Sequence, residues 1–318
     1  MKSILEARDL KNKKVLVRVD WNVPFENEKV ADDFRIKKSL PTLEYLKNAG
    51  AKVIIATHLE SGSASVEPLK TFVPAGMEFL ENLRNNLGEE NNSEEFSKEL
   101  ASKADIYVNE AFSVSHREHA SIVGVPKYLP HYAGLEFMEE VKALSKAFNP
   151  PHPFLLILGG AKFETKLPLV EKFINIADEI FIAGAIAKPA SEMPFATNPK
   201  ITFPVGDIAA LDANEETIEN CKLKIENSNL ILWNGPLGKY EEGYKEGTIK
   251  LAQILAGSGS PRFGEAGKEI IVGGGDTLAV IKELNLYDKF SFVSTGGAAM
   301  LTYLATGTLP GIEALTNK

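Results

Sequence analysis

Apolar runs alternate with helical patterns along the first half of the chain. Four runs predict buried strands: Lys14–Asp20, Lys52–His58, Met77–Arg84 and Ala104–Asn109. Between these runs, apolar residues recur at the spacing of an amphipathic helix over Ile36–Asn48 and Ser93–Lys103. Strands that alternate with helices are typical of a parallel sheet with crossover connections. The pattern therefore predicts an α/β unit.

The second half continues the alternation, but each of its apolar runs is followed by glycine or by a turn that contains glycine. The runs are Phe154–Leu158, Glu179–Ile182, Leu230–Trp233, Glu269–Val272 and Phe290–Val293. Glycine allows the backbone to turn sharply at the carboxyl end of a strand and to come close to a ligand. Ligands bind at that edge of open parallel sheets, so we expect a ligand site there.

A central helical segment separates the two halves. Leu135–Phe148 has the pattern of one amphipathic helix, and the sequence NPPHP that follows at Asn149–Pro153 cannot continue it. The strands of the first half end in Asp, His, Arg or Asn, whereas those of the second half end in glycine. This difference suggests one lobe for a small charged substrate and another for phosphates and a nucleotide.

Composition narrows the class of protein. The 318 residues are 44% hydrophobic and 25% charged, which is ordinary for a globular protein that buries sizeable cores. No apolar run reaches the roughly 18 residues that a membrane span needs, and the first residues do not resemble a secretory signal. The single Cys221 excludes an internal disulfide and a cysteine-rich metal site. We therefore expect a cytoplasmic protein.

Charge gives a further restriction. The net charge of −8 argues against non-specific binding of nucleic acid, which needs a basic surface. Only six arginines occur, and Arg35, Arg84 and Arg117 lie beside predicted strand ends or loops of the first half. They could be surface cations, but the planar fork of arginine suits phosphate and carboxylate groups. These three residues are therefore candidates for an anion site.

Sequence motifs identify a family resemblance. Neither the Walker A pattern nor G-x-G-x-x-G occurs, so the usual P-loop and dinucleotide sites are not expected. The first half instead contains VRVDWNVP (Val17–Pro24), DDFRI (Asp32–Ile36), ATHL (Ala56–Leu59), LENLR (Leu80–Arg84), YVNEAF (Tyr107–Phe112) and SHREHAS (Ser115–Ser121). The second half contains LGGAKFETK (Leu158–Lys166), LWNGPLGKYE (Leu232–Glu241), GGGDT (Gly273–Thr277) and STGG (Ser294–Gly297). In this order, the motifs closely resemble phosphoglycerate kinase from end to end.

The resemblance implies a fold and an activity. The expected fold has two lobes, each a mostly parallel, Rossmann-like β-sheet flanked by helices, joined by a central helix that serves as a hinge. Residues 1–150 would form the 3-phosphoglycerate domain and residues 151–318 the nucleotide-binding domain, with the C-terminal tail packing back on the first. The reaction would be reversible phosphoryl transfer from 1,3-bisphosphoglycerate to ADP with Mg²⁺, in glycolysis. We expect a monomer that binds these small molecules and neither nucleic acid nor membrane.

The resemblance also implies substrate-binding residues in the first half. Asp20 and Asn22 would bind the hydroxyl and carboxylate end of the three-carbon acid, although a turn-forming pair is a simpler reading of the two residues alone. Arg35, His58, Arg84 and Arg117 would form the basic cluster that binds 3-phosphoglycerate. Taken alone, His58 at a strand end reads as a buried core histidine.

The nucleotide site and the transfer chemistry would lie in the second half. Lys162 and Lys166 are four residues apart after a glycine turn, where a helix N-terminus attracts anions. By resemblance Lys166 and Arg35 are the catalytic residues, and Asp276 binds Mg²⁺. The nucleotide-binding set is Gly160, Lys162, Lys166, Gly184, Asn234, Glu241, Gly273, Gly274, Gly275, Asp276 and Thr277. No general base is evident, and an attacking carboxylate needs none because it is ionised at neutral pH.

The chain is shorter than the family and departs from it in several places. After His58 the family has Gly-Arg-Pro, where this chain has Glu60-Ser61-Gly62, so one substrate-binding arginine is absent and a carboxylate lies nearby. The region from Pro189 to Asn214, which helps to enclose the nucleotide base in the family, is much shortened. These departures leave open a catalytically impaired relative that binds its ligands weakly. An oxidoreductase that uses a dinucleotide is a second alternative, disfavoured by the missing G-x-G-x-x-G motif.

Overall fold

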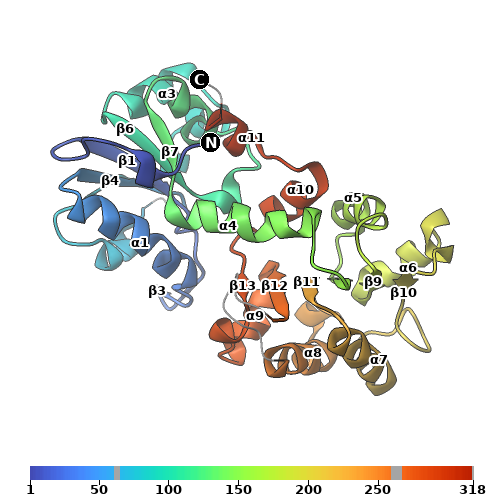
Figure 1. The fold of residues 1–318 in the computed structure, drawn as a ribbon. Helices are drawn as coiled ribbons and strands as arrows, with labels where there is room; N and C mark the ends of the chain where they lie inside the picture. Colours follow the sequence, from blue (N-terminus) through green and yellow to red (C-terminus); the bar gives the residue numbers. More distant parts are fainter. Residues whose placement is uncertain (61–64, 259–266, 317–318) are drawn as a thin grey trace. The chain divides into compact units, whose positions relative to one another are not determined.

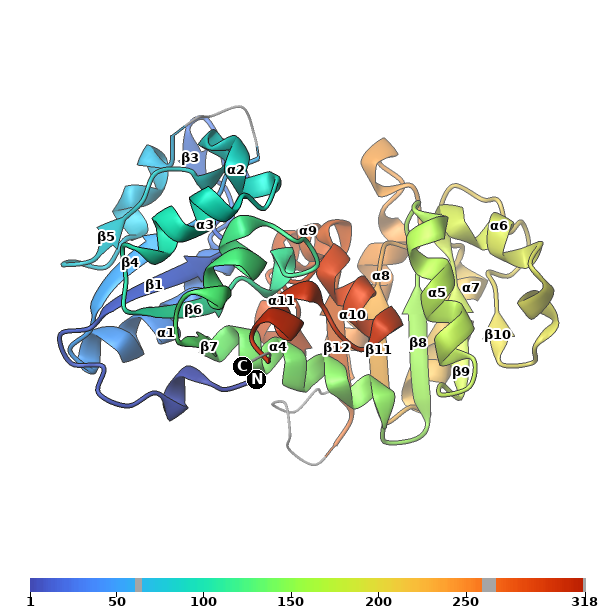
Figure 2. The same ribbon diagram turned by 90° about the horizontal axis from the view of Figure 1, so that it is seen from above.

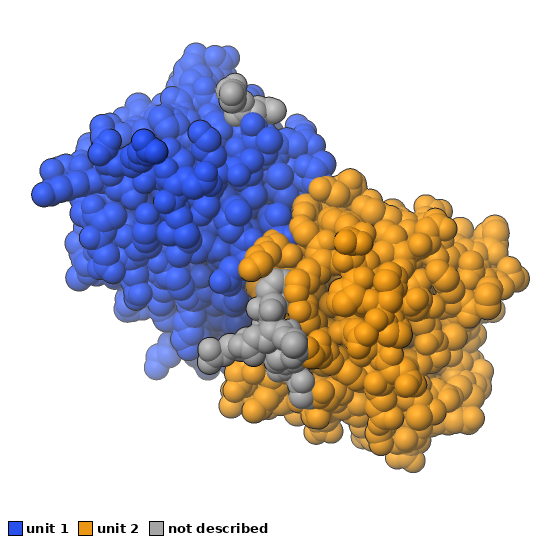
Figure 3. Space-filling view, in the orientation of Figure 1, with its two compact units in different colours: residues 1–141, 308–318 blue, residues 142–307 orange. Residues whose placement is uncertain are grey.

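The structure is a computed structural model that describes residues 1–60, 65–258 and 267–316. It contains two compact units, coloured separately in Figure 3. Unit 1 comprises residues 1–141 and 308–318, and unit 2 comprises residues 142–307. The division lies inside helix α4 (Leu135–Ser145), whereas the sequence suggested a boundary after this helix. Ser61, Gly62 and Arg262 lie outside the described residues.

Unit 1 is built on a five-stranded sheet in the order β5-β4-β1-β6-β7, with every neighbouring pair parallel. The strands are β1 (Lys14–Val19), β4 (Lys52–Ala56), β5 (Glu78–Phe79), β6 (Ile106–Glu110) and β7 (His131–Ala133). Apart from the exposed first residues of β1 and β4, the three central strands are buried throughout, as near-continuous apolar runs predict for a parallel sheet covered on both faces. A hairpin of β2 (Phe25–Glu26) and β3 (Lys29–Val30) is separate from this sheet.

The helices of unit 1 cover both faces of its sheet. Helix α1 (Phe34–Asn48) lies against one face, and α3 (Glu94–Ala101) against the other, preceded by the short α2 (Leu87–Glu90) (Figures 1 and 2). The fully buried Trp21 donates its indole N–H to Ser39 Oγ at 2.8 Å, which ties the end of β1 to α1. This contact places the first turn of α1 beside the carboxyl end of β1.

Unit 2 contains a six-stranded parallel sheet in the order β10-β9-β8-β11-β12-β13. The strands are β8 (Phe154–Leu158), β9 (Glu179–Ile182), β10 (Ile201–Thr202), β11 (Leu230–Asn234), β12 (Glu269–Gly273) and β13 (Phe292–Val293). Helices α5 (Phe163–Phe173) and α10 (Ala298–Thr306) pack on one face, and α7 (Glu215–Glu226), α8 (Glu246–Gly257) and α9 (Gly275–Glu283) on the other (Figure 1). The short α6 (Ala187–Ser191) follows β9.

Both sheets have a topological switch point. In unit 1 the chain runs outward from β1 through β4 to β5 and then returns to the opposite side of β1 as β6. In unit 2 it runs from β8 through β9 to β10 and then returns beside β8 as β11. Ligands of doubly wound sheets bind in the crevice at the carboxyl ends of the strands where the order reverses. The predicted Rossmann-like, two-lobed α/β fold is confirmed, and each lobe has one such edge.

The last helix belongs to unit 1. Helix α11 (Pro310–Ala314) packs against residues 120–124, and Gly311 donates its backbone N–H to Ser115 O at 2.9 Å. A side chain at Gly311 would lie 2.6 Å from the atoms of Ser115, so glycine is required for this approach. Among the described residues, no helix combines the length and the apolar character that crossing a membrane requires.

Candidate active site

The switch point of unit 1 carries a network of charged side chains that begins at Asp20. Asp20 follows β1 directly, and its Oδ2 accepts hydrogen bonds from Arg35 Nη1 at 2.8 Å and from the Ser113 hydroxyl. Arg35 lies in the first turn of α1, and Ser113 follows β6. Burial alone would raise the pKa of Asp20, but Arg35, with Ser113 and Arg18, lowers it to about 2. The network therefore contains an ionised Asp20.

His58 adds a hydrogen-bond donor to this network. It follows β4 and is fully buried, with Nδ1 3.1 Å from Arg18 Nη2 and 4.0 Å from Asp20 Oδ1. Because a guanidinium group can only donate, Nδ1 accepts and the ring proton is on Nε2. Burial and the charge of Arg18 lower the pKa of His58 to about 3, so the ring is neutral. Its buried Nε2 has no hydrogen-bond partner in the described part of the chain.

Arg84 and Arg117 meet at the carboxylate of Glu60. Glu60 Oε1 is 2.8 Å from Arg84 Nη1 and 3.1 Å from Arg117 Nη1. The hydrogen bond from Arg84 is the main cause that lowers the pKa of Glu60 to about 2, so this carboxylate is ionised across the neutral range. The backbone N–H of Glu60 donates to Asn22 Oδ1 at 3.2 Å. An acidic side chain therefore lies between two of the arginines that the sequence predicted to bind the substrate.

The six residues that sequence reasoning placed at the substrate site therefore belong to one set of contacts in unit 1. Arg35 connects the two parts, because its Nη1 donates both to Asp20 and to the backbone oxygen of Asn22 at 3.2 Å. Arg84 contributes its charge to the lowered pKa of His58. The set is Asp20, Asn22, Arg35, His58, Arg84 and Arg117.

Sequence reasoning missed the buried support of this network. Arg18, the last residue but one of β1, is 1% exposed, and its Nε donates to Ser121 Oγ at 2.8 Å. Ser121 in turn donates to the buried Glu89, whose Oε1 is 3.9 Å from Arg18 Nη2. The sequence does contain a signal for this buried support, which is the single arginine within the apolar strand KVLVRV. A buried charge needs a partner, so this arginine predicts a nearby acidic residue.

The switch point of unit 2 is a cavity of about 810 Å³. This volume is in the range of small-molecule sites. The cavity lies at the ends of β8, β11 and β12 and extends between α5 and α10, where Pro168, Leu301 and Ala305 line it. Eight of the predicted nucleotide-binding residues line it: Gly160, Lys162, Lys166, Asn234, Glu241, Gly274, Gly275 and Asp276.

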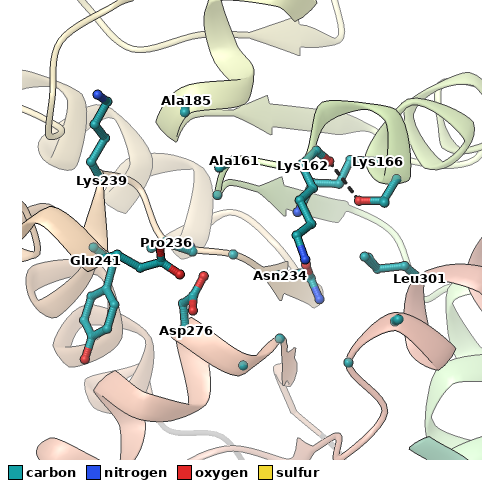
Figure 4. Close-up of a pocket in the computed structure, with 18 of the residues that line it drawn as sticks. Ala161, Lys162, Lys166, Ala185, Asn234, Pro236, Lys239, Glu241, Asp276 and Leu301 are labelled. Carbon is teal, nitrogen blue, oxygen red and sulfur yellow. Dashed lines mark hydrogen bonds between the residues drawn. The ribbon is translucent and has the colours of Figure 1, made fainter. Parts of the chain in front are cut away.

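Charged side chains lie on opposite sides of this cavity. Figure 4 shows Lys162, Lys166 and Asn234 on one side and the carboxylates of Glu241 and Asp276 on the other. Lys162 immediately precedes α5 and is exposed, whereas Lys166, one turn later, is 6% exposed. Burial lowers the pKa of Lys166, and Asp276 opposes that shift. Within the described ranges neither lysine has a carboxylate at ion-pair distance, so an anionic ligand would be favoured here.

Glycines bring the ends of β8 and β11 together beneath the cavity. A side chain at Gly159 would lie 2.1 Å from Pro236 O, and one at Gly235 would lie 2.3 Å from Gly159 O. Gly235 also has a φ of +96°, which L-residues rarely adopt. The two turns are held by hydrogen bonds from Gly159 N to Asn234 O at 2.9 Å and from Gly160 N to Pro236 O at 2.7 Å.

Three predicted nucleotide-binding residues do not line the cavity and instead shape its walls. Gly184 (φ +65°) packs against the turn, where a side chain would lie 2.8 Å from Pro236 O. Thr277 is buried, and its Oγ1 accepts a hydrogen bond from Gly235 N at 2.9 Å. A side chain at Gly273 would lie 2.4 Å from Met300 Sδ. The residue that lines the cavity after β9 is Ala185.

The side chains at this cavity would suit a metal ion that enters bound to the phosphates of a ligand. In the described ranges, no group of three or more His, Cys, Asp or Glu side chains is placed to bind a metal ion. Asp276 offers one exposed carboxylate at the start of α9. Magnesium binds through one or two carboxylates together with substrate phosphates and water, and such a site needs no more from the protein.

Comparison with known proteins decides the family. A sequence model of the family described as phosphoglycerate kinase matches residues 5–75, 63–193 and 190–307. The chain belongs to the phosphoglycerate kinase family. It is 34% identical to the phosphoglycerate kinase of Fervidobacterium nodosum, with 98% of this chain and 97% of the relative covered. It is 35% identical to that of Orientia tsutsugamushi, with 97% and 96% covered.

Solved phosphoglycerate kinases have the same fold. The enzyme from Coxiella burnetii aligns with a TM-score of 0.82 at 30% identity, covering 99% of this chain and 98% of that one. The enzyme from Pyrococcus horikoshii aligns with a TM-score of 0.85 at 26% identity and the same coverage. The sequence alignment with the Fervidobacterium relative spans 393 positions, more than the 318 residues of this chain. The relative therefore contains internal residues that have no counterpart here.

The chain is thus a kinase, and the predicted family is confirmed. Near-complete coverage by phosphoglycerate kinases favours an active enzyme over the catalytically impaired relative. It also leaves the dinucleotide-dependent oxidoreductase without support.

Proposed function

We propose that this chain transfers a phosphoryl group reversibly from 1,3-bisphosphoglycerate to ADP, with the carboxyl group of 3-phosphoglycerate as the acceptor in the reverse direction. The observation that carries the proposal is the pair of different anion sites at equivalent edges of the two sheets. Unit 1 has a compact network of arginines and Asp20, suited to a small acid. Unit 2 has a glycine-lined cavity with Lys162 and Lys166, suited to a nucleotide.

In unit 1, Asp20 and Asn22 would bind the hydroxyl and carboxylate end of the three-carbon acid, and Arg84 and Arg117 its phosphate. The neutral His58 supports this assignment because its buried Nε2–H needs an acceptor. Its contribution is a hydrogen bond and not a charge. Arg35, held by Asp20 at 2.8 Å and 29% exposed, would contact the transferring group.

In unit 2, Lys162 and Lys166 would contact the nucleotide phosphates, together with the backbone N–H groups that begin α9 at Gly275. Glu241, on the other side of the cavity, would hydrogen-bond the ribose hydroxyls, and Asp276 would hold the Mg²⁺ that the phosphates carry. Magnesium would neutralise charge on the phosphate oxygens during transfer.

The chemistry needs no general base from the protein. The attacking carboxylate is ionised at neutral pH because its ordinary pKa is about 3 to 4. What remains is alignment and stabilisation of the charge on the transferring group, which Arg35 and Lys166 would supply. The proposal includes a hinge movement that brings the two bound ligands to reacting distance and excludes water. It also includes a cytoplasmic location and a monomeric state. Light scattering on the purified protein would check the monomeric state.

A coupled assay of ATP formation tests the proposal. With saturating 1,3-bisphosphoglycerate and ADP, we expect steady ATP formation that stops with EDTA and returns with added Mg²⁺. Removal of either substrate should reduce the rate to background. Binding of both ligands without ATP formation would instead support the impaired relative.

A further inference from the structure

Glu60 occupies a position in unit 1 where the proposed substrate requires positive charge. Its single oxygen Oε1 contacts both Arg84 and Arg117, and these two arginines are the proposed phosphate ligands. The side chain is 47% exposed, so its carboxylate borders solvent. Arg84 is 11% exposed and belongs to the wall of the site.

The donors around Glu60 outnumber the acceptor atoms that it supplies. Arg84 Nε and Nη2 and His58 Nε2 are buried and have no hydrogen-bond partner among the described residues. Arg84 Nε has Glu90 Oε1 at 3.3 Å, without hydrogen-bond geometry. A phosphate group has three acceptor oxygens and up to two negative charges, whereas Glu60 uses one oxygen and has one charge.

We infer that Glu60 is an internal placeholder anion that the phosphate group of the substrate must displace from Arg84 and Arg117. The inference rests on the proposed function. A carboxylate and a phosphate cannot both bind the guanidinium nitrogens of Arg84 and Arg117 that Glu60 contacts. The two anions would then be a few ångströms apart, and like charges so close repel strongly. The phosphate is favoured because it has more charge and can accept hydrogen bonds from more donors. The carboxylate of the displaced Glu60 returns to water at little cost, because this side chain is already half exposed.

The exchange makes the effect of Glu60 on affinity depend on the ligand. A tethered carboxylate competes at a high effective concentration, so a ligand that offers only another carboxylate gains nothing by replacing it. A phosphate ester gains both charge and hydrogen bonds. Glu60 therefore lowers the affinity for the phosphorylated substrate, and an acid without a phosphate group does not reach the two arginines. Because its pKa of about 2 keeps Glu60 ionised, the competition persists throughout the neutral range.

Calorimetric titration of the full chain tests the exchange. The ligands are 3-phosphoglycerate and D-glycerate, which lacks the phosphate, and the variants are Glu60→Gln and Glu60→Ala. Glu67→Gln is the matched control, because it removes the same charge from an exposed residue of the same unit whose ion pair is with Lys70. We expect Glu60→Gln and Glu60→Ala to lower the Kd of 3-phosphoglycerate about tenfold or more. The Kd of D-glycerate should change less than twofold, and Glu67→Gln should change neither.

Thermal unfolding provides a second readout that is independent of the first. Without ligand, Glu60→Gln should have a lower Tm than the wild type, because Arg84 and Arg117 lose their counterion. The rise in Tm on adding 3-phosphoglycerate should be larger for Glu60→Gln than for the wild type.

Three results would overturn the inference. Unchanged 3-phosphoglycerate affinity in both Glu60 variants would show that no exchange occurs, and weaker affinity would show that Glu60 organises the arginines for binding. An equal gain in 3-phosphoglycerate affinity in Glu67→Gln would show that the effect comes from the net charge of the protein and not from the position of Glu60. Each of these can occur in a wild type that forms ATP normally. Failure of the proposed function would appear instead as a wild type that neither binds 3-phosphoglycerate nor forms ATP.

Discussion

The two units have the same strand order around their switch points, yet they treat charge in opposite ways. In unit 1 the functional side chains are paired with one another, as in Asp20 with Arg35 and Glu60 with Arg84. In unit 2 the buried Lys166 has no carboxylate at ion-pair distance within the described residues, and burial lowers its pKa. The same topology therefore supports two kinds of site. In unit 1 the charged side chains pair with one another, and in unit 2 a buried lysine has no such pair in the part of the chain that the structure describes.

The difference follows from what ends the strands. Side chains such as Asp20 and His58 bring their own charges or donors to the edge, and a buried charge such as that of Asp20 requires a partner. Glycines such as Gly159 and Gly235 bring only backbone groups, which turn sharply and approach each other closely. A ligand of the proposed site in unit 1 would therefore exchange with a partner such as Glu60, whereas a ligand of the proposed site in unit 2 would fill a cavity.

The largest effect is expected where the backbone of unit 2 has no spare space. Gly235→Ala would place a methyl group 2.3 Å from Gly159 O at a φ of +96°. We expect it to destabilise unit 2 by about 3 to 5 kcal/mol and to abolish nucleotide binding. Gly243→Ala is the control, because its φ of +91° is similar but no atom lies within 4 Å. It should cost about 1 kcal/mol from backbone strain alone. Equal losses of unfolding free energy in urea would disprove the close-approach argument.

The next effect concerns the uncompensated lysine. Lys166→Ala should lower kcat by about 100- to 1000-fold and change the KM of either substrate little, because its charge is needed most during transfer. Steady-state kinetics of ATP formation gives both constants. Lys188→Ala, an exposed lysine paired with Glu192 at 3.0 Å, is the control and should keep wild-type values. A raised KM at normal kcat would assign Lys166 to binding only.

A buried carboxylate in unit 1 should make stability depend on pH. Burial raises the pKa of Glu110 to about 7 from an ordinary 4.5, although Thr42 and the backbone N–H groups of Glu136 and Phe137 donate to it. The folded state thus holds its proton more tightly than the unfolded state, and stability is lost as the pH rises from about 4.5 through 7. The shift corresponds to about 3 kcal/mol.

Glu110→Gln should flatten the stability profile between pH 5 and 8 without removing its slope entirely. The neighbouring Glu136, paired with Lys38 at 3.2 Å, also has a raised pKa, caused mainly by burial, and titrates in the same direction. Urea unfolding at a series of pH values measures the profile. An unchanged slope in Glu110→Gln would show that Glu110 is ionised in the folded protein.

The smallest effect concerns base recognition in unit 2. None of residues 189–214, the shortened region, lines the cavity. An open wall loses apolar contact but leaves few buried donors unpaired, so selectivity should be weak. We expect titration with ATP and GTP to give affinities that differ by less than about a hundredfold, or about 2.7 kcal/mol. A larger preference would show that other residues enclose the base.

Sequence patterns predicted the central strands well because strands covered on both faces are near-continuous apolar runs. The edges were less predictable. Of the predicted strand Met77–Arg84, only Glu78–Phe79 is a strand, because Asn82 turns the chain by accepting a hydrogen bond from Arg84 N at 3.1 Å. The edge strand β7 (His131–Ala133) was not predicted, since three residues carry too little pattern.

The candidate site shows the same division between local and long-range information. Motifs indicated Asp20, Arg35 and Lys166 because residue type and strand position are local properties. They could not decide whether Glu60 pairs with Arg84 or with Arg117, and the structure shows contact with both. That outcome depends on residues far apart in the sequence.

The position of helix α11 has a consequence for the order in which the protein is made. Unit 1 includes residues 308–318, which are synthesised only after the whole of unit 2. Gly311 in α11 holds the backbone of Ser115, two residues before Arg117. A nascent chain can therefore complete unit 2 first, and the loop that carries Arg117 gains the support of α11 only when that helix has left the ribosome. Unit 1, which is proposed to bind the acid, is therefore completed after unit 2 although most of its sequence precedes it.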